Sequence, residues 1–261
     1  MPSRRAEQDW SGSGAYYGSR VRAGPREYSG IIVRKMTIIR AEYSGDHRDV
    51  AIISDRHGQP NVAALQNALG PNEGLYKTLL LGPEVAIGMA GDGRLCNLIL
   101  AEALGLPESQ EPSLISSLVS GEDRLFLSFP DAAHAFEQAA SVVVARKRPP
   151  LAVDSTAILV GRLNGRPVIA ELSRTTKWRF VHVMERPAYC IPEGMTDSDL
   201  LLYKSYVTRP GLDYIASLKA AVEFCADRYE SVNHRYVLRC LKDGFRREEG
   251  EVPQGASLPS S

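Results

Sequence analysis

The sequence predicts an α+β fold: a four-layer α-β-β-α sandwich, in which two antiparallel sheets are stacked and a pair of helices covers each outer face. One reason is the order of the elements, because strand-like and helix-like runs come in blocks rather than in the alternation typical of a parallel sheet. The other is that the strand-like runs 50–55 and 84–91 are apolar almost throughout. A strand covered on both faces loses the alternation of polar and apolar residues.

The first half of the predicted domain contains two hairpins and two helices. The strand-like runs are 36–44, 49–55, 75–82 and 84–91. A turn-rich stretch at 45–48 joins the first two runs. Asp92 is placed to cap a helix that ends near Gly105, because an Asp side chain accepts the first free N–H groups of a helix. After a polar linker over 106–130, apolar residues at helical spacing predict a helix over 131–144.

The second half contains a three-strand meander, two helices and a last strand. The strand-like runs are 155–163, 166–173, 177–184 and 234–242. The pair Asn164–Gly165 indicates a tight hairpin turn between the first two of these. Thr196 and Asp199 resemble a capping box that opens a helix over 199–207, and a longer helix is expected over 210–229.

Composition and charge exclude several classes of protein. The chain has 261 residues, of which 44% are hydrophobic and 24% charged, as in ordinary globular proteins. Its 31 basic residues balance 31 acidic ones, which argues against a nucleic-acid-binding role. No run approaches the roughly 20 apolar residues of a membrane helix, and the N-terminal segment lacks the apolar stretch of a secretory signal. We therefore expect neither a nucleic acid nor a membrane as a partner.

The four cysteines and the two ends of the chain complete this outline. Cys96, Cys190, Cys225 and Cys240 are scattered, without a CxxC pair or a histidine at zinc spacing, which predicts reduced thiols in a cytoplasmic protein and no metal site. Residues 1–35 are interpreted as a disordered extension, a propeptide or a start assigned too far upstream, and residues 246–261 as a disordered tail. One domain, 36–245, lies between them.

From residue 36 to residue 241, these pieces resemble the proteasome β-type family and its simpler bacterial relatives, which are N-terminal-nucleophile (Ntn) hydrolases. The matching pieces are the run MTIIRAEYS, the strand ending in SDR, the block from Lys77 to Asp92, the run KRPPLAVDSTAILVG, and Asp227-Arg-Tyr229. The block from Lys77 is the most specific, because Lys77 precedes Gly91 by fourteen residues, the family's spacing between its catalytic lysine and its turn glycine. The resemblance implies the same sandwich fold.

The resemblance makes Thr37 the candidate nucleophile. Once it is freed at an N-terminus, a threonine hydroxyl attacks a carbonyl carbon, while its own α-amine, with a pKa of about 8, accepts the proton. Thr37 follows Met36, and removal of an initiator methionine ahead of a small residue is a normal route to a free N-terminus. The alternative is that Thr37 is a β-branched residue at the start of an ordinary strand.

Five more residues receive roles from the same resemblance. Lys77 is expected to lower the pKa of the hydroxyl and of the amine by its positive charge, and Asp55 to hold Lys77 through a charge-assisted hydrogen bond. The N–H of Gly91 is the candidate oxyanion-hole donor. Met89 is expected to line the pocket for a substrate side chain, and Asp227 to support the site from outside it. Each of three residues also has an ordinary structural explanation. Asp55 could form a turn, Lys77 could occupy an exposed strand position, and Met89 could belong to the hydrophobic core.

The resemblance implies a threonine-type peptidase that hydrolyses peptides or unfolded proteins. It further implies a homo-oligomeric ring that encloses the active sites, no cofactor, and ATP use left to a partner unfoldase ring. The family's Gly-Ser-Gly segment is replaced here by 188–194, and the serine expected after Tyr229 is Glu230. Two alternatives stay open: a non-catalytic ring subunit, and an Ntn amidohydrolase that acts on small molecules.

Overall fold

The computed structural model describes residues 38–56, 77–105, 126, 128–147, 155–183, 186–192, 194–242 and 244–255. By its internal contacts the chain divides into the unit Met1–Ile32 and the unit Val33–Ser261. The expected extension 1–35 and most of the expected linker 106–130 lie outside the described residues. Everything below refers to the second unit.

The described residues form two antiparallel sheets and four helices, an α+β composition. The first sheet consists of β1 (Ile39–Tyr43), β2 (Val50–Asp55), β8 (Ala188–Cys190), β9 (Arg235–Leu241) and β10 (Phe245–Glu251). The second consists of β3 (Thr78–Gly82), β4 (Val85–Gly91), β5 (Ser155–Leu163), β6 (Arg166–Ser173) and β7 (Val181–His182). The helices are α2 (Gly93–Ala103), α4 (Phe129–Lys147), α5 (Asp197–Val207) and α6 (Tyr214–Ala226). The strand orders are β10-β9-β2-β1-β8 and β3-β4-β5-β6-β7.

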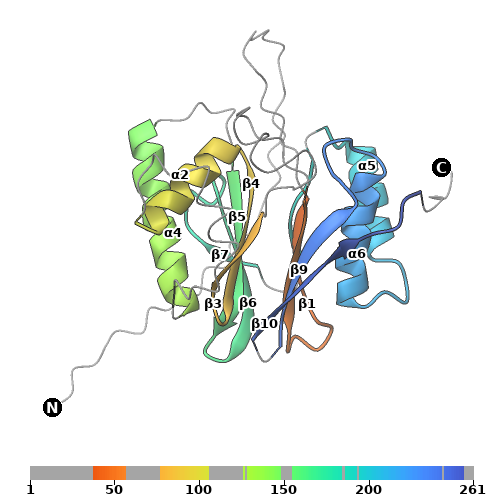
Figure 1. The fold of residues 1–261 in the computed structure, drawn as a ribbon, viewed down its shortest axis with the longest axis horizontal. Coiled ribbons are helices and arrows are strands. Elements are labelled where there is room, and N and C mark those ends of the chain that lie inside the picture. Colours follow the sequence, from red (N-terminus) through yellow and green to blue (C-terminus); the bar gives the residue numbers. More distant parts are fainter. Residues whose placement is uncertain are drawn as a thin grey trace, which may run out of the picture. The chain divides into compact units, whose positions relative to one another are not determined.

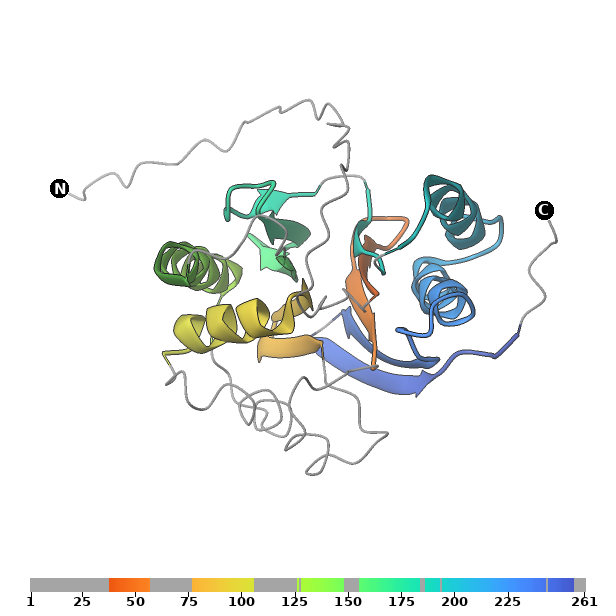
Figure 2. The same ribbon diagram turned by 90° about the horizontal axis from the view of Figure 1, so that it is seen from above.

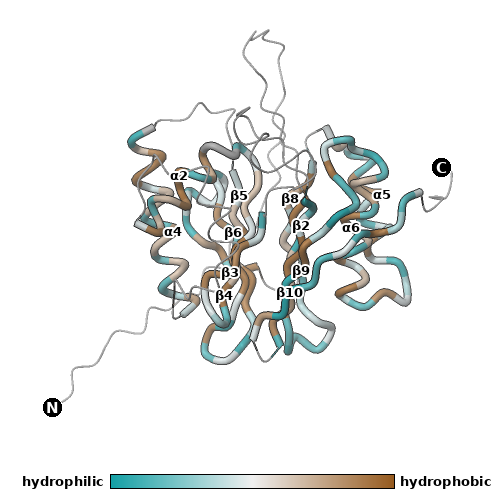
Figure 3. The backbone as a smooth tube through the Cα atoms, in the orientation of Figure 1, coloured by the Kyte–Doolittle hydropathy of each residue, from teal (hydrophilic) through white to brown (hydrophobic). Residues whose placement is uncertain are grey.

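The two sheets face each other, and each has a pair of helices on its other side (Figures 1 and 2). One hydrophobic cluster packs α2 and α4 against the second sheet, and another packs α5 and α6 against the first. A third cluster joins the sheets through residues such as Ile39, Ile52, Ile158 and Val160. Figure 3 shows the inner strands coloured mainly as hydrophobic, as expected for strands that are covered on both faces. The predicted two-sheet sandwich is confirmed at this level.

Gly88 on β4 shows how closely the sheets approach each other. A Cβ atom at this position would lie 2.8 Å from Cγ2 of Ile39 and 2.9 Å from Cδ1 of Ile52, both of which belong to the opposite sheet. A glycine within a strand is typical of such a close approach. The site described below lies at one end of this tight contact.

Several local signals in the sequence are confirmed. Asn164 and Gly165 have φ angles of 52° and 77°, the left-handed pair that a two-residue hairpin turn requires. Asp92 caps α2 by accepting the N–H of Leu95 at 2.7 Å. Thr196 and Asp199 form the predicted capping box of α5.

Three predictions about the strands need correction. The run 177–184 forms only the two-residue strand β7, because Lys177 and Trp178 adopt φ angles of 55° and 59° and turn the chain. The three residues of β8 were not predicted. The tail from Arg246 was expected to be disordered, whereas 245–251 pair with β9 as the edge strand β10. Because β10 is charged and mainly exposed, its sequence lacks the alternation of apolar residues that predicts a strand. Charged residues are nevertheless common in the edge strands of sheets.

None of the helices in the described parts of the chain is long and apolar enough to cross a membrane.

Candidate active site

A buried ion pair joins the two sheets at one end of the sandwich. The Nζ atom of Lys77 lies 2.7 Å from Oδ1 and 2.8 Å from Oδ2 of Asp55, so the ammonium group donates to both carboxylate oxygens. The Asp55 side chain is completely buried and that of Lys77 is 10% exposed. Asp55 ends β2 and Lys77 immediately precedes β3, which brings residues far apart in the sequence together. Charge-assisted bonds of this length are strong, and burial protects them from screening by salt.

Asp55 also holds the beginning of the first strand. Its Oδ1 atom accepts a hydrogen bond from the backbone N–H of Ile38 at 3.1 Å. The nitrogen of Ile38 belongs to the peptide group that links it to Thr37, which itself lies outside the described residues. One carboxylate therefore fixes both the ammonium group of Lys77 and the backbone directly after the candidate nucleophile.

Burial lowers the pKa of Lys77, because the charged ammonium group loses its hydration there. The negative charge of Asp55 and its hydrogen bond oppose this effect, and Cys190 on β8 acts in the same direction as Asp55. Burial raises the pKa of the Cys225 thiol on α6, and the negative charge of Asp55 adds to this effect. The Asp55 carboxylate thus holds the amino group of Lys77 in place and opposes the loss of its proton that burial favours.

The strand β4 carries the next two predicted residues. The N–H of Met89 donates to the carbonyl of Lys77 at 2.9 Å, which fixes the backbone of Lys77 against β4. The half-buried side chain of Met89 packs against the cluster under α2 and α4. Gly91 ends β4 with a φ angle of 106°, a conformation that favours glycine, and the chain then turns into α2 at Asp92. Gly91 therefore follows, by two residues on the same strand, the Met89 N–H that binds the backbone of Lys77.

Asp227 is separate from the ion pair. Its Oδ1 atom lies 2.8 Å from Nε2 of His234 and accepts the N–H of Gly255 at 3.3 Å. Among the described residues, no hydrogen bond joins Asp227 to Asp55 or Lys77. His234 immediately precedes β9, where Tyr236 pairs with Asp55. Sequence reasoning found no partner for His234, because its partner lies across a helix-to-strand connection.

Sequence reasoning missed three polar residues near the pair. Cys190 pairs with Ile39 in the β1–β8 ladder and packs against the cluster between the sheets. Ser54 on β2 and Thr78 on β3 are fully buried, and within the described part of the chain their hydroxyl groups have no hydrogen-bond partner. Each adjoins a member of the ion pair in the sequence. Only their neighbours Asp55 and Lys77 gave a signal, since a lone Ser or Thr in a strand predicts nothing.

Within the described ranges, no three His, Cys, Asp or Glu side chains are grouped so that they could hold a metal ion. The chemistry that the described groups offer is that of a fixed positive charge. A cation beside a hydroxyl or an amine favours the deprotonated form of that group and so makes it a better nucleophile at neutral pH.

No protein-family model matches the chain, and no curated protein matches it. Among solved structures it is similar to one described as Anbu (ancestral beta-subunit) from Yersinia bercovieri, with 13% sequence identity and a TM-score of 0.53. The similarity covers 85% of this chain and 88% of that one. At such an identity the similarity shows the fold alone, which this chain shares with that ancestral beta-subunit.

Proposed function

We propose that this chain is a threonine-type peptidase of the proteasome-like, self-compartmentalising kind, with Thr37 as its nucleophile. The observation that carries the proposal is the position of Asp55. This carboxylate holds both the Lys77 ammonium group, at 2.7 Å, and the N–H of Ile38, at 3.1 Å. A cation held near the start of β1 would favour the deprotonated, nucleophilic form of a threonine hydroxyl there.

The proposed reaction begins with processing that leaves Thr37 as the N-terminus. Its hydroxyl oxygen attacks the carbonyl carbon of a peptide bond, and its α-amine takes the hydroxyl proton. That proton then passes to the leaving amine, which leaves an ester between the threonine and the acyl part of the substrate. Water hydrolyses the ester in a second step. The role of Lys77 is to stabilise the deprotonated hydroxyl, and Asp55 keeps the ammonium group charged and in place.

Three residues have supporting roles in this proposal. Gly91 offers its N–H to the oxyanion that forms during the attack, since its position at the β4–α2 turn allows a close approach of the backbone. Met89 contributes to the pocket for the substrate side chain. Asp227, bound to His234, acts from a distance by supporting the segment before β9.

The rest of the proposal concerns surroundings and partners. The chain forms a homo-oligomeric ring in the cytoplasm, takes peptides or unfolded proteins as substrates, and depends on an ATPase ring for folded ones. It needs no cofactor, since the threonine supplies both the nucleophile and the base. The fold shared with an ancestral beta-subunit supports the ring.

Two measurements on the full chain test the proposal. N-terminal sequencing of the mature protein is expected to start at Thr37. Hydrolysis of fluorogenic peptides is expected to fall by about 10³-fold or more in a Thr37→Ala variant, because loss of a nucleophile removes the covalent route. The control is Thr208→Ala, which changes an exposed threonine at the end of α5 and is expected to keep full activity.

Other outcomes would favour the alternatives. A particle with an intact N-terminus, a ring-like mass and no peptidase activity indicates a non-catalytic ring subunit. A stable monomer of 28.6 kDa that hydrolyses small amides but not peptides indicates an amidohydrolase. Full peptidase activity in Thr37→Ala contradicts the assigned nucleophile.

A further inference from the structure

Three turns meet at the end of the sandwich opposite the ion pair. They are the turns between β1 and β2, between β5 and β6, and between β9 and β10. Together they line an open depression of about 560 Å³. Its lining includes the cationic side chains of Arg48, Arg162, Arg166 and Lys242 and one carboxylate, that of Asp49. The proposed peptidase site makes no use of this basic depression.

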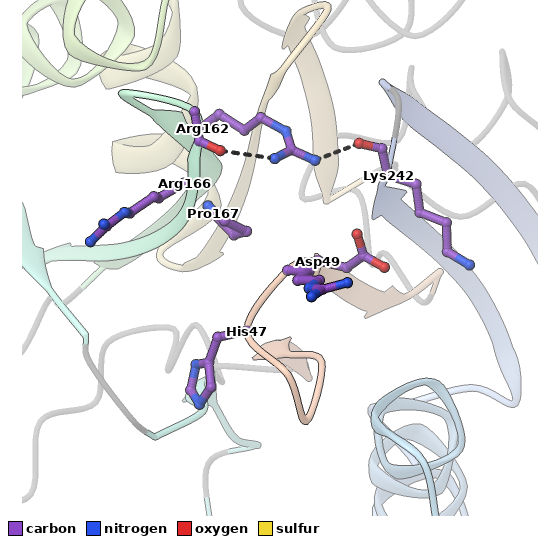
Figure 4. A pocket seen from close by; sticks show the side chains of 8 residues that line it. His47, Asp49, Arg162, Arg166, Pro167 and Lys242 are labelled. Atoms are coloured by element: carbon purple, nitrogen blue, oxygen red, sulfur yellow. Dashed lines mark hydrogen bonds between the residues drawn. The ribbon is translucent and has the colours of Figure 1, made fainter.

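Arg162 lines the basic depression and is held there by backbone carbonyl groups of two turns (Figure 4). Its Nη1 atom donates to the carbonyl of Gly165 at 3.1 Å, and its Nη2 atom donates to the carbonyl of Lys242 at 2.5 Å. Its Nε atom lies 3.6 Å from a carboxylate oxygen of Glu84. These contacts connect the β5–β6 turn to the β9–β10 turn, so the fold fixes the distance between these two turns.

The cations on the rim are available to a ligand. Arg166 and Lys242 are exposed, and within the described ranges no ion pair or side-chain hydrogen bond occupies them. Figure 4 shows their side chains pointing in different directions from the edge of the depression. The side chain of Arg48 is 85% exposed, with Asp46 at 3.5 Å. Charges that are spread in this way suit an extended ligand better than a single compact anion.

The β1–β2 turn is held rigidly beside these cations. The Ser44 hydroxyl donates to Asp46 at 2.6 Å and accepts the backbone N–H of Asp49 at 2.9 Å. His47 has a φ angle of 54°, which is uncommon for a residue other than glycine. Residues are kept in such conformations where the surroundings fix them, and this occurs often at binding sites. The turn therefore presents its side chains in a defined arrangement.

A second, mainly apolar depression adjoins the first. Its volume is about 850 Å³, and His47, Arg166 and Pro167 line both. Leu163 and Tyr43 are among its other lining residues. The Tyr43 hydroxyl already donates to the carbonyl of Val183 at 3.0 Å and accepts the N–H of Ile169 at 2.8 Å. A ligand bound here would therefore contact an apolar surface beside the positive charge of Arg166.

We propose that the basic and the apolar depressions together bind a peptide segment of a partner protein in which acidic residues flank a large apolar residue. The carboxylates would contact Arg166 and Lys242, and the apolar side chain would lie against Leu163 and Pro167. Complementary charge favours such a segment and directs its approach. Small-molecule sites usually enclose most of their ligand, whereas these two adjoining depressions are open, which favours an extended chain.

A nucleic acid fits these observations less well. Nucleic-acid surfaces carry a continuous excess of basic residues, whereas this chain is neutral overall. The carboxylate of Asp49 in the basic depression would repel a phosphate backbone, and Arg166 is the only Arg or Lys among the described residues that line the apolar depression.

The test measures fluorescence anisotropy of a labelled peptide, Glu-Glu-Leu-Glu-Glu-Leu-Glu, with the full chain. The double variant Arg166→Gln/Lys242→Gln is expected to weaken binding by about five- to twentyfold, because each exposed charge contributes modestly. The control, Arg146→Gln/Lys204→Gln, removes two exposed cations from α4 and α5 and is expected to bind like the unchanged protein. A peptide with Gln in place of Glu, and one with Ala in place of Leu, are each expected to bind more weakly.

Several results would overturn the proposal. Equal affinities for the double variant and its control mean that the basic depression is not the binding site. Equal affinities for the Glu and Gln peptides mean that charge is not recognised, and equal affinities for the Leu and Ala peptides mean that the apolar depression is not used. Displacement of the peptide by an equal concentration of an oligouridine indicates a general anion surface. The substituted side chains are exposed, and Lys242→Gln alone gives the same test if the double variant is unstable.

Discussion

A Lys77→Met substitution removes the ammonium group from the buried ion pair and keeps a side chain of similar length. The carboxylate of Asp55 stays completely buried and loses a partner that lies 2.7 Å from one of its oxygens and 2.8 Å from the other. Removing one member of a buried ion pair costs about 3–5 kcal/mol, because the remaining charge is neither hydrated nor paired. Since domains are stable by about 5–15 kcal/mol, this loss would be a large share of the total.

The measurement is urea unfolding followed by circular dichroism, and the chain offers a matched control. Lys219 pairs with Glu248 at the same distance, 2.7 Å, but these side chains are 33% and 49% exposed. Solvent screens such a pair, so Lys219→Met is expected to cost about 0–1 kcal/mol. Because the two ion pairs have the same distance, a difference between the two substitutions in the free energy of unfolding reports the effect of burial. A second Asp55→Asn change in the Lys77→Met background is expected to recover part of the loss, because it removes the buried negative charge that has lost its ammonium partner.

The prediction fails if Lys77→Met costs no more free energy of unfolding than Lys219→Met. That result would mean that water reaches the ion pair in solution, and the fixed cation on which the proposed chemistry depends would then be screened. An Asp55→Asn change that worsens the Lys77→Met variant would contradict the reasoning as well.

Three further predictions concern the same region. Because burial lowers the pKa of Lys77 below its usual 10.5, the unfolded chain keeps this proton at pH values where the folded chain has lost it. The free energy of unfolding of the unchanged protein, relative to Lys77→Met, should therefore increase with pH up to about 10.5, and urea titrations that show a decrease would contradict this. Gly88→Ala is expected to cost about 1–3 kcal/mol, since the added Cβ would lie 2.8 Å from Ile39, and an unchanged thermal midpoint would refute it. Thr78→Val is expected to leave stability unchanged or raise it by about 1 kcal/mol, because it removes a buried unpaired hydroxyl, whereas a loss in calorimetry would show that this hydroxyl is paired in solution.

Most elements of the fold could be predicted because their signals are local. Caps at Asp92 and Thr196 and the turn at Asn164–Gly165 each depend on a few neighbouring residues, so propensity and hydrogen bonding within that stretch decide them. The predictions were wrong where pairing with a distant strand decides the outcome. The run 245–251 is charged and shows no strand pattern, yet β9 gives it partners along its whole length.

The candidate site divides in the same way. From the sequence, Lys77, Asp55 and Gly91 were proposed as members of one site through a family resemblance, and the structure places Lys77 against Asp55 and fixes its backbone to β4, the strand that ends at Gly91. Asp227 was expected to support this site from outside it; in the structure it bonds to His234, and its role in the site stays a prediction. The structure shows these contacts, and the catalytic roles of all the candidate residues, Thr37 and Met89 included, stay predictions.

By itself the sequence determined the class of fold and the caps and turns, because hydrophobic periodicity and short motifs are properties of neighbouring residues; the candidate residues came from a family resemblance. Only the tertiary structure decided that a single carboxylate holds both Lys77 and the backbone of Ile38, and that three distant turns gather Arg48, Arg166 and Lys242 around one depression. The physical reason is that hydrogen bonds and charges act over a few ångströms in space. Residues that are far apart in the chain can interact only after the sheets have packed and fixed their positions.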